Sequence, residues 1–459
     1  LYFPHSCNLG IYPKLDYFRF LQYKLIIKKI INLSRIETNF TSEYFSMSKR
    51  NKIISQINKL DQKDVKNFIY KENNIFQMAL PSVLHFLRAE NINFNSSLDI
   101  KVLYETMSNI CIMYDSSIKY LENNKPDVIF LINGLHWPAS SMIAAAKKKN
   151  IKYITSEESF RRPYMNKFYP SFQLDVNRDS HQKYSTIENF REYLNKPDRE
   201  IDYQLLDKFL KVREESKTET ITYANKSNQD NQLLLKLKNF SKIRKTFVLF
   251  TGIGWDSAYR YNASSAFESS EEWLRETATF FVNKDVNLII RIHPAESYSN
   301  FSMKKKTISI VEDLRQKENI FVINSSDKVS AYSLMELVKG GLTWASTTGL
   351  EMAIKGLPVI TAFDRIYTQL GCSIDPRTKI DYFKHLDEMI NSKINIDIEK
   401  TKYIARKIAY YYFIELNYPV RFINRGFDYD LPSLNLQSIK ELEEGSDESL
   451  DSICNLVTS

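Results

Sequence analysis

The sequence predicts an α/β protein built from two Rossmann-like domains that face each other across a cleft. Short apolar runs rich in β-branched residues alternate with helical segments in the second half of the chain. One further unit of this kind precedes them, near residue 130. Such runs are typical of parallel strands covered on both faces. Their alternation with helices favours a doubly wound sheet.

Length and composition narrow the class of protein. The chain has 459 residues, 43% hydrophobic and 26% charged, which favours two or three water-soluble globular domains. No apolar stretch is long enough for a membrane helix. The net charge of +8 is spread along the chain, so no nucleic-acid partner is expected. Composition alone explains this excess, and so does a basic face toward anionic lipid or a phosphorylated substrate.

The four cysteines form no C-x-x-C pair. We therefore expect a reducing compartment and a cytoplasmic location. The chain starts without Met, and no signal peptide follows. We expect an N-terminal domain that is truncated, with a first β-strand missing.

A β-α-β unit is expected in the N-terminal half, after about 120 mainly helical residues. Its parts are a strand at Val128–Ile132, a helix at Ser140–Lys149 and a strand at Ile151–Thr155. Parallel strands end at the same edge of a sheet, so the loops holding His136 and Glu157-Glu158 should lie on that edge.

The alternation becomes regular after Asn225–Gln232, the best linker candidate. Five strands are expected, at Phe247–Thr251, Asn287–Ile292, Ile320–Asn324, Leu342–Ala345 and Pro358–Ala362. Three helices are expected among them, at Ser270–Phe281, Ala331–Lys339 and Leu350–Lys355. The predicted domains are an acceptor-side domain at 1–235, a nucleotide-binding domain at 241–400, and a helix crossing back with an acidic tail at 401–459. From Glu441 onward we expect disorder.

Glycine marks the functional half. Only 11 residues are glycine, and seven of these lie between 252 and 371. Three loops in this region follow strands at the edge where open α/β sheets bind ligands. The candidate residues in these loops are Gly252, Gly254 and Asp256, then Arg291 and His293, then Ser346, Thr347, Thr348, Gly349 and Glu351.

The third loop allows two interpretations. Hydroxyl side chains before a helix start, with its unpaired N–H groups, bind phosphate well. Thr348 and Glu351 also fit a T-x-x-E capping box, which needs no ligand. His293, placed after a strand and before Pro294, is a candidate for contacting a phosphate or a leaving group. Asp256 serves equally well as a helix cap.

The motifs of these loops resemble those of a known family. F-T-G-I-G-W-D-S-A, R-I-H-P-A-E and S-T-T-G-L-E-M-A-I-K-G-L-P-V-I are similar to the bacterial capsule polysaccharide biosynthesis glycosyltransferases, as are K-P-D-V-I-F-L-I-N-G and I-T-S-E-E-S. The resemblance implies a GT-B fold and a nucleotide-sugar donor. Gly252 stands where the family pattern has Asn, and residues 364–375 only loosely match its basic, Gly-rich segment.

The resemblance implies roles for particular residues. His293, Ser346, Thr347 and the helix start at Gly349 would hold the nucleotide phosphate, and Glu351 the ribose. From their expected place beyond the strand ends, and not from the resemblance, Glu158, Glu157 or His136 would be the general base toward a saccharide or lipid-linked acceptor. The two predicted Rossmann-like domains contain no D-x-D motif, so no metal and no cofactor are expected.

Other functions keep the same fold. A nucleotide-sugar epimerase, a polyol-phosphate transferase and an inactive scaffold in a polysaccharide assembly complex are the alternatives. Peripheral contact with the inner membrane face is a further expectation. The donor sugar and the linkage are not fixed by the sequence.

Overall fold

The computed structural model describes residues 44–165, 167–178, 187–219, 221–257, 265–298, 303–424 and 433–458. These residues form two compact units, one up to Tyr153 and one from Ile154, with Arg88–Glu90 assigned to the second. The predicted functional domains at 1–235, 241–400 and 401–459 stay a prediction. In the part of the chain that is described, no helix is long and apolar enough to cross a membrane.

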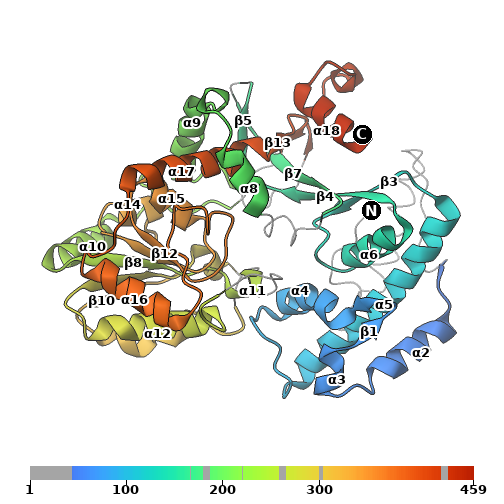
Figure 1. The fold of residues 1–459 in the computed structure, drawn as a ribbon, viewed down its shortest axis with the longest axis horizontal. Helices are drawn as coiled ribbons and strands as arrows, with labels where there is room; N and C mark the ends of the chain where they lie inside the picture. Colours follow the sequence, from blue (N-terminus) through green and yellow to red (C-terminus); the bar gives the residue numbers. More distant parts are fainter. Residues whose placement is uncertain are drawn as a thin grey trace. The chain divides into compact units, whose positions relative to one another are not determined.

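The first unit is mainly helical (Figure 1). Its elements are α2 (Met47–Ile57), α3 (Gln62–Lys66), β1 (Ile69–Tyr70), β2 (Asn73–Asn74), α4 (Ile75–Leu87), α5 (Ser97–Asn124), β3 (Val128–Ile132) and α6 (Ala139–Lys149). Ser96 caps α5 by accepting from the Asp99 N–H at 3.3 Å, and Lys125 ends it in the left-handed region with φ 44°. α5 packs between α4 and α6. The predicted strand 128–132 and the helix after it are therefore present.

The second unit begins within β4 (Lys152–Glu158). It continues with β5 (Arg162–Tyr164), β6 (Lys167–Tyr169), β7 (Ser171–Val176), α8 (Ile187–Leu194), η3 (Asp198–Glu200), α9 (Tyr203–Glu214) and α10 (Asn231–Ile243). The strands β5, β6 and β7 were not predicted from the sequence. β4 pairs antiparallel with β7, so Glu158 lies opposite Phe172 in a strand. The expected loop position of Glu157 and Glu158 is therefore wrong.

A five-stranded parallel sheet forms the centre of the second unit. Its strands are β8 (Thr246–Phe250), β9 (Asn287–Arg291), β10 (Ile320–Ile323), β11 (Gly341–Thr343) and β12 (Val359–Thr361), in the order β10-β9-β8-β11-β12. All five predicted strands are present, each within two residues of its predicted ends. The order reverses between β8 and β11. Open α/β sheets bind ligands at such a switch point, beyond the carboxyl ends of the strands.

Helices cover both faces of this sheet (Figure 1). The connecting elements are α11 (Gly254–Ser257), α12 (Ser270–Val282), η4 (Pro294–Ser297), α13 (Ile308–Val311), η5 (Glu312–Gln316), α14 (Ala331–Met335), α15 (Thr348–Ile354) and α16 (Lys379–Ile390). Phe247 and Leu249 of β8 face a core made with α12 and α16. Val248 and Phe250 face the other core, made with α10 and α14. This alternation explains the continuous apolar runs of the strands.

The C-terminal segment packs onto elements from 160–214 and onto α15. It contains α17 (Ile398–Tyr410), the π-helix η6 (Tyr411–Glu415), β13 (Tyr418–Pro419), β14 (Ile423–Asn424), β15 (Ser433–Leu434), η7 (Ile439–Leu442) and α18 (Glu448–Thr458). α17 contacts α8, α9 and α15, and β13 pairs with β7.

The tail is ordered, and the expected disorder after Glu441 is wrong. The Arg421 guanidinium binds the buried Asp447 carboxylate at 2.5 Å. Ser449 donates to the Pro419 carbonyl at 2.7 Å, and Ser438 and Glu441 form a capping box on η7. Two of the acidic groups whose density suggested disorder, Glu441 and Asp447, therefore have partners.

Candidate functional site

A cavity of about 330 Å³ lies where β8, β9 and β11 end. It is lined entirely by residues of the second unit. Six predicted site residues are among them: Arg291, His293, Ser346, Thr347, Thr348 and Glu351. Residues from 160–224 also line it, although they precede the sheet in sequence. The cavity therefore occupies the switch point of the sheet.

The loop between β11 and α15 presents hydroxyl groups to the cavity. Ala345 takes a left-handed φ of 47°, a conformation that strains a residue with a Cβ atom. The Ser346 hydroxyl accepts from the Thr348 N–H at 3.2 Å and donates to the Thr348 hydroxyl at 3.0 Å. Thr347 occupies the N-cap position without a side-chain cap. The T-x-x-E capping box is therefore not formed, because Thr348 already belongs to the helix.

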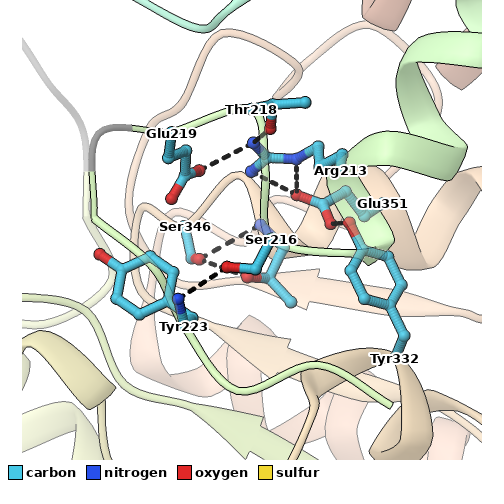
Figure 2. A network of polar contacts seen from close by, with 9 residues as sticks. Arg213, Ser216, Thr218, Glu219, Tyr223, Tyr332, Ser346 and Glu351 are labelled. Carbon is cyan, nitrogen blue, oxygen red and sulfur yellow. Dashed lines mark hydrogen bonds and ion pairs between the residues drawn. The ribbon is translucent and has the colours of Figure 1, made fainter. Parts of the chain in front are cut away.

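The Glu351 carboxylate has different partners. It is buried, at 6% exposure, and its Oε1 accepts from Arg213 Nε at 2.9 Å. A second Arg213 nitrogen lies 2.8 Å from the same oxygen, and the Tyr332 hydroxyl donates to Oε2 (Figure 2). Burial, followed by the charge of Glu351, raises the pKa of Tyr332 well above its ordinary value. The tyrosine therefore remains a donor.

Arg213 was missed by the sequence analysis. It lies at the end of α9 and its guanidinium is stacked 5.0 Å from the centres of two rings, Phe160 and Phe413. The terminal nitrogen of Arg213 that does not contact Glu351 lies 2.7 Å from the Glu219 carboxylate. Although burial opposes the charged form, the carboxylates of Glu351 and Glu219 raise the pKa of Arg213 well above its ordinary value. Arg213 is therefore permanently charged.

His293 is held by two backbone contacts. The backbone N–H of His293 donates to the Thr251 hydroxyl at 2.9 Å, and the ring Nδ1 accepts from the backbone N–H of Ala295 at 3.2 Å. Burial, followed by the neighbouring Arg291, lowers the pKa of His293 from 6.5 to about 4. At neutral pH the ring is uncharged, and since Nδ1 is an acceptor the proton sits on Nε2. The tautomer makes Nε2 a hydrogen-bond donor.

Arg291 has a largely structural set of contacts. Its guanidinium donates to the carbonyls of Asn324 at 2.5 Å and Asp327 at 3.1 Å. Burial lowers the pKa of Arg291 to about 10, which leaves it charged at neutral pH. Its charge lies beside the cavity while these donors fix the loop after β10.

Four residues of the three predicted loops do not line the cavity: Gly252, Gly254, Asp256 and Gly349. A Cβ atom on Gly349 would lie 2.2 Å from the Tyr367 hydroxyl, so packing against that ring requires glycine. A Cβ on Gly252 would lie 3.0 Å from the Trp344 carbonyl. Asp256 is exposed in α11. The clustering of the few glycines therefore indicated the region of the cavity, but Gly252 and Gly349 are required there by packing rather than by a ligand.

The two candidate bases lie in different units. Glu158 is in β4 and is half-buried. His136 belongs to the first unit, where its ring centre is 5.1 Å from that of His85. Neither residue lines the cavity. Within the described ranges, no group of three or more His, Cys, Asp or Glu residues could hold a metal ion.

Comparison with known proteins agrees with the motifs. Residues 176–395 match the family model described as capsule polysaccharide biosynthesis protein. No curated protein matches the chain. Two similar solved structures are KpsC from Thermosulfurimonas dismutans, described as a beta Kdo 2,4 transferase, and the UDP-GlcNAc 2-epimerase of Methanocaldococcus jannaschii.

Both similarities are distant. The KpsC match has 14% identity and a TM-score of 0.36, and covers 62% of this chain and 78% of KpsC. The epimerase match has 15% identity and a TM-score of 0.30, and covers 73% of this chain and 96% of the epimerase.

Proposed function

Because residues 176–395 match the model of the capsule polysaccharide biosynthesis family, we propose that the chain belongs to this family and is a glycosyltransferase. It would move a sugar from a nucleotide-sugar donor to a growing capsular or other cell-surface polysaccharide. The nucleotide would occupy the cavity beyond β8, β9 and β11. Neither a metal nor a cofactor is part of this proposal.

The position and chemistry of the cavity carry the proposal. Hydroxyl groups of Ser346, Thr347 and Thr348 line it at the switch point of a parallel sheet. The uncharged His293 adds an Nε2–H donor. Donors fixed in advance by the fold stabilise charge that develops on a leaving group without further reorganisation. A departing nucleotide phosphate is such a group.

The reaction would break the bond between the anomeric carbon and the phosphate oxygen and form one to an acceptor hydroxyl oxygen. His293 and Ser346 would bind the leaving phosphate. Both lone pairs of Glu351 Oε1 are used by Arg213, whereas Oε2 retains one beside the Tyr332 hydroxyl and would accept from a ribose hydroxyl. The acceptor proton would pass to Glu158, with His136 as the alternative base.

The setting of this reaction is also part of the proposal. A donor made in the cytoplasm and a saccharide or lipid-linked acceptor would meet at the inner membrane face, where the chain would be peripheral. The four nucleotide classes to be compared are CMP-, UDP-, GDP- and CDP-linked sugars, because the structure leaves the base unspecified.

The first experiment is a thermal-shift screen of the protein against these four classes. A ligand at about 100 times its Kd stabilises the native state by about 2.7 kcal/mol, which raises the melting temperature by several degrees. Product analysis with the bound donor then follows. Release of nucleotide that depends on acceptor indicates transfer, whereas an isomeric donor without release indicates the epimerase alternative. A chain that binds none of the four would contradict the proposal.

Ser346→Ala tests the site within this scheme. It removes the hydroxyl that faces the cavity and caps the Thr348 N–H. We expect the Kd of the best nucleotide to rise about tenfold, equivalent to about 1.4 kcal/mol. The matched control is Ser297→Ala, since Ser297 is exposed on η4 and outside the cavity. An equal effect of the two substitutions would remove Ser346 from the site.

A further inference from the structure

Arg213 is a buried charge at the cavity that none of the reaction steps uses. It is 9% exposed, and it enters from α9 rather than from a loop of the parallel sheet. A charge is buried at considerable free-energy expense unless it is paired. The contacts of Arg213 extend in two directions, and they show what the residue holds in place.

The first direction leads to α15. Nε and one terminal nitrogen of Arg213 both bind Oε1 of Glu351, at 2.9 and 2.8 Å. The Tyr332 hydroxyl donates to Oε2, so both carboxylate oxygens have hydrogen-bond donors. These contacts fix the orientation of the Glu351 side chain, which lines the cavity (Figure 2).

The second direction leads to the loop that follows α9. The other terminal nitrogen of Arg213 binds Glu219 at 2.7 Å and the Thr218 hydroxyl at 3.4 Å. Ser216 of the same loop accepts from the Tyr223 N–H at 2.6 Å. Residues 216, 218, 219 and 223 all line the cavity. One guanidinium therefore contacts two parts of the cavity wall.

We propose that Arg213 is the positioning residue of the cavity: it fixes Glu351 and the loop residues 216–219 in the arrangement that receives the nucleotide. The ligand in this statement rests on the proposed function, whereas the effect on the loop does not. Arg213 acts through Glu351 and the loop.

The geometry requires arginine at this position. Its nitrogens lie in one plane and point in fixed directions, so a single side chain serves Glu351 and Glu219 together. A lysine keeps the charge but offers one mobile ammonium group. The stacked rings of Phe160 and Phe413 also match a flat guanidinium. Arg213→Lys should therefore lose the positioning effect while the charge stays.

A neighbouring ion pair supplies a matched control. Lys355 binds Glu214 at 2.7 Å, and this pair joins the same two helices, α9 and α15. Both side chains are about one-third exposed, and Lys355 does not line the cavity. Lys355 also lies 5.3 Å from the centre of the Tyr332 ring, against which a Met side chain can still pack. Lys355→Met therefore removes a link between the helices while every contact of Arg213 stays in place.

The first arm of the experiment needs no ligand. Hydrogen exchange of the amides in 216–219 and of Tyr223 is measured on the full chain, at a temperature where each variant is folded. We expect exchange at least tenfold faster in Arg213→Lys, and unchanged in Lys355→Met. Should Arg213→Lys fail to fold, Glu219→Gln replaces it, since this partly exposed carboxylate is the loop side of the network. Exchange that is unchanged in Arg213→Lys, or in Glu219→Gln where this variant replaces it, would overturn the proposal.

The second arm measures the Kd values of UDP, CMP, GDP and CDP by calorimetry. We expect the strongest of these to bind at least tenfold more weakly to Arg213→Lys, and equally well to Lys355→Met. The double variant with Glu351→Gln should bind no more weakly than Glu351→Gln alone, because residues that act as a unit are not additive. Fully additive losses would overturn the positioning role. If wild-type protein binds none of the four nucleotides, the proposed function fails, and the exchange arm still decides the role of Arg213.

Discussion

Replacing His293 by asparagine should remove a defined part of the pH dependence of stability. The asparagine side-chain oxygen can still accept from the Ala295 N–H, as Nδ1 of the histidine does. The imidazole titrates with a pKa of about 4 in the folded protein, because burial and then Arg291 disfavour the charged ring. In the unfolded chain its pKa is about 6.5.

The sign follows from these two values. Between pH 6.5 and pH 4 the unfolded chain binds the extra proton, so the folded state loses stability as the pH falls through this window. Below the folded-state value both forms are protonated and the loss stops. At pH 5 the expected loss relative to pH 7.5 is about 2 kcal/mol. The slope falls to half its maximum at pH 6.5 and is nearly gone by about pH 7.5.

The assay is urea denaturation of wild type and His293→Asn at pH 7.5 and at pH 5. Subtracting the two proteins cancels the other titrating groups. We expect the wild type to lose about 2 kcal/mol more than the variant between these conditions. An equal loss in both proteins would mean that the ring is accessible to protonation in the folded state. The assignment of His293 as an uncharged donor would then be wrong.

Two further substitutions test the packing around the site and the C-terminal segment. Gly349→Ala should destabilise the protein by about 1–3 kcal/mol in thermal denaturation, because the new Cβ meets the buried Tyr367 hydroxyl. Adding Tyr367→Phe should restore part of the lost stability. If it restores none, the strain does not arise at the Tyr367 hydroxyl. Arg421→Met should leave the Asp447 carboxylate, 2% exposed, without its 2.5 Å partner. We expect the free energy of unfolding to fall by about 1–3 kcal/mol and trypsin to cleave faster after Lys440. Cleavage of the variant at the wild-type rate would show that other contacts hold α18.

Local pattern was sufficient to predict the parallel sheet. Strand runs such as Val248–Phe250 are apolar at every position because opposite faces enter different cores. The loops after these strands were located for the same reason, since parallel strands share one carboxyl edge. The antiparallel strands β5–β7 were missed because their sequences are polar and mixed. In addition, β7 pairs with Tyr418 of β13, a residue far away in the chain.

The roles within the cavity were harder to predict than its place. Arg213 binds a carboxylate 138 positions further along the chain, and no local pattern indicates that contact. Glu351 had the spacing of a capping box, but the helix begins at Thr348 and the carboxylate turns toward Arg213. Gly349 matched a phosphate-binding motif, although its lack of a side chain is required by Tyr367. In each case tertiary packing decided between two local interpretations.

The charge distribution of the cavity bears on how it would bind a phosphate. The charge of Arg213 is balanced by Glu351 and Glu219, and the Arg291 donors are directed to backbone carbonyls. His293 is uncharged at neutral pH because burial and Arg291 lower its pKa. The neutral donors that line the wall, among them the hydroxyls of Ser346–Thr348, would therefore hold the anion together with Arg365, a cationic residue that also lines the cavity. Neutral donors are weak individually, and they stabilise a developing charge well only when they are already oriented toward it. This requirement explains why a buried network centred on Arg213 would be kept beside a site that has neutral hydroxyl donors along its wall.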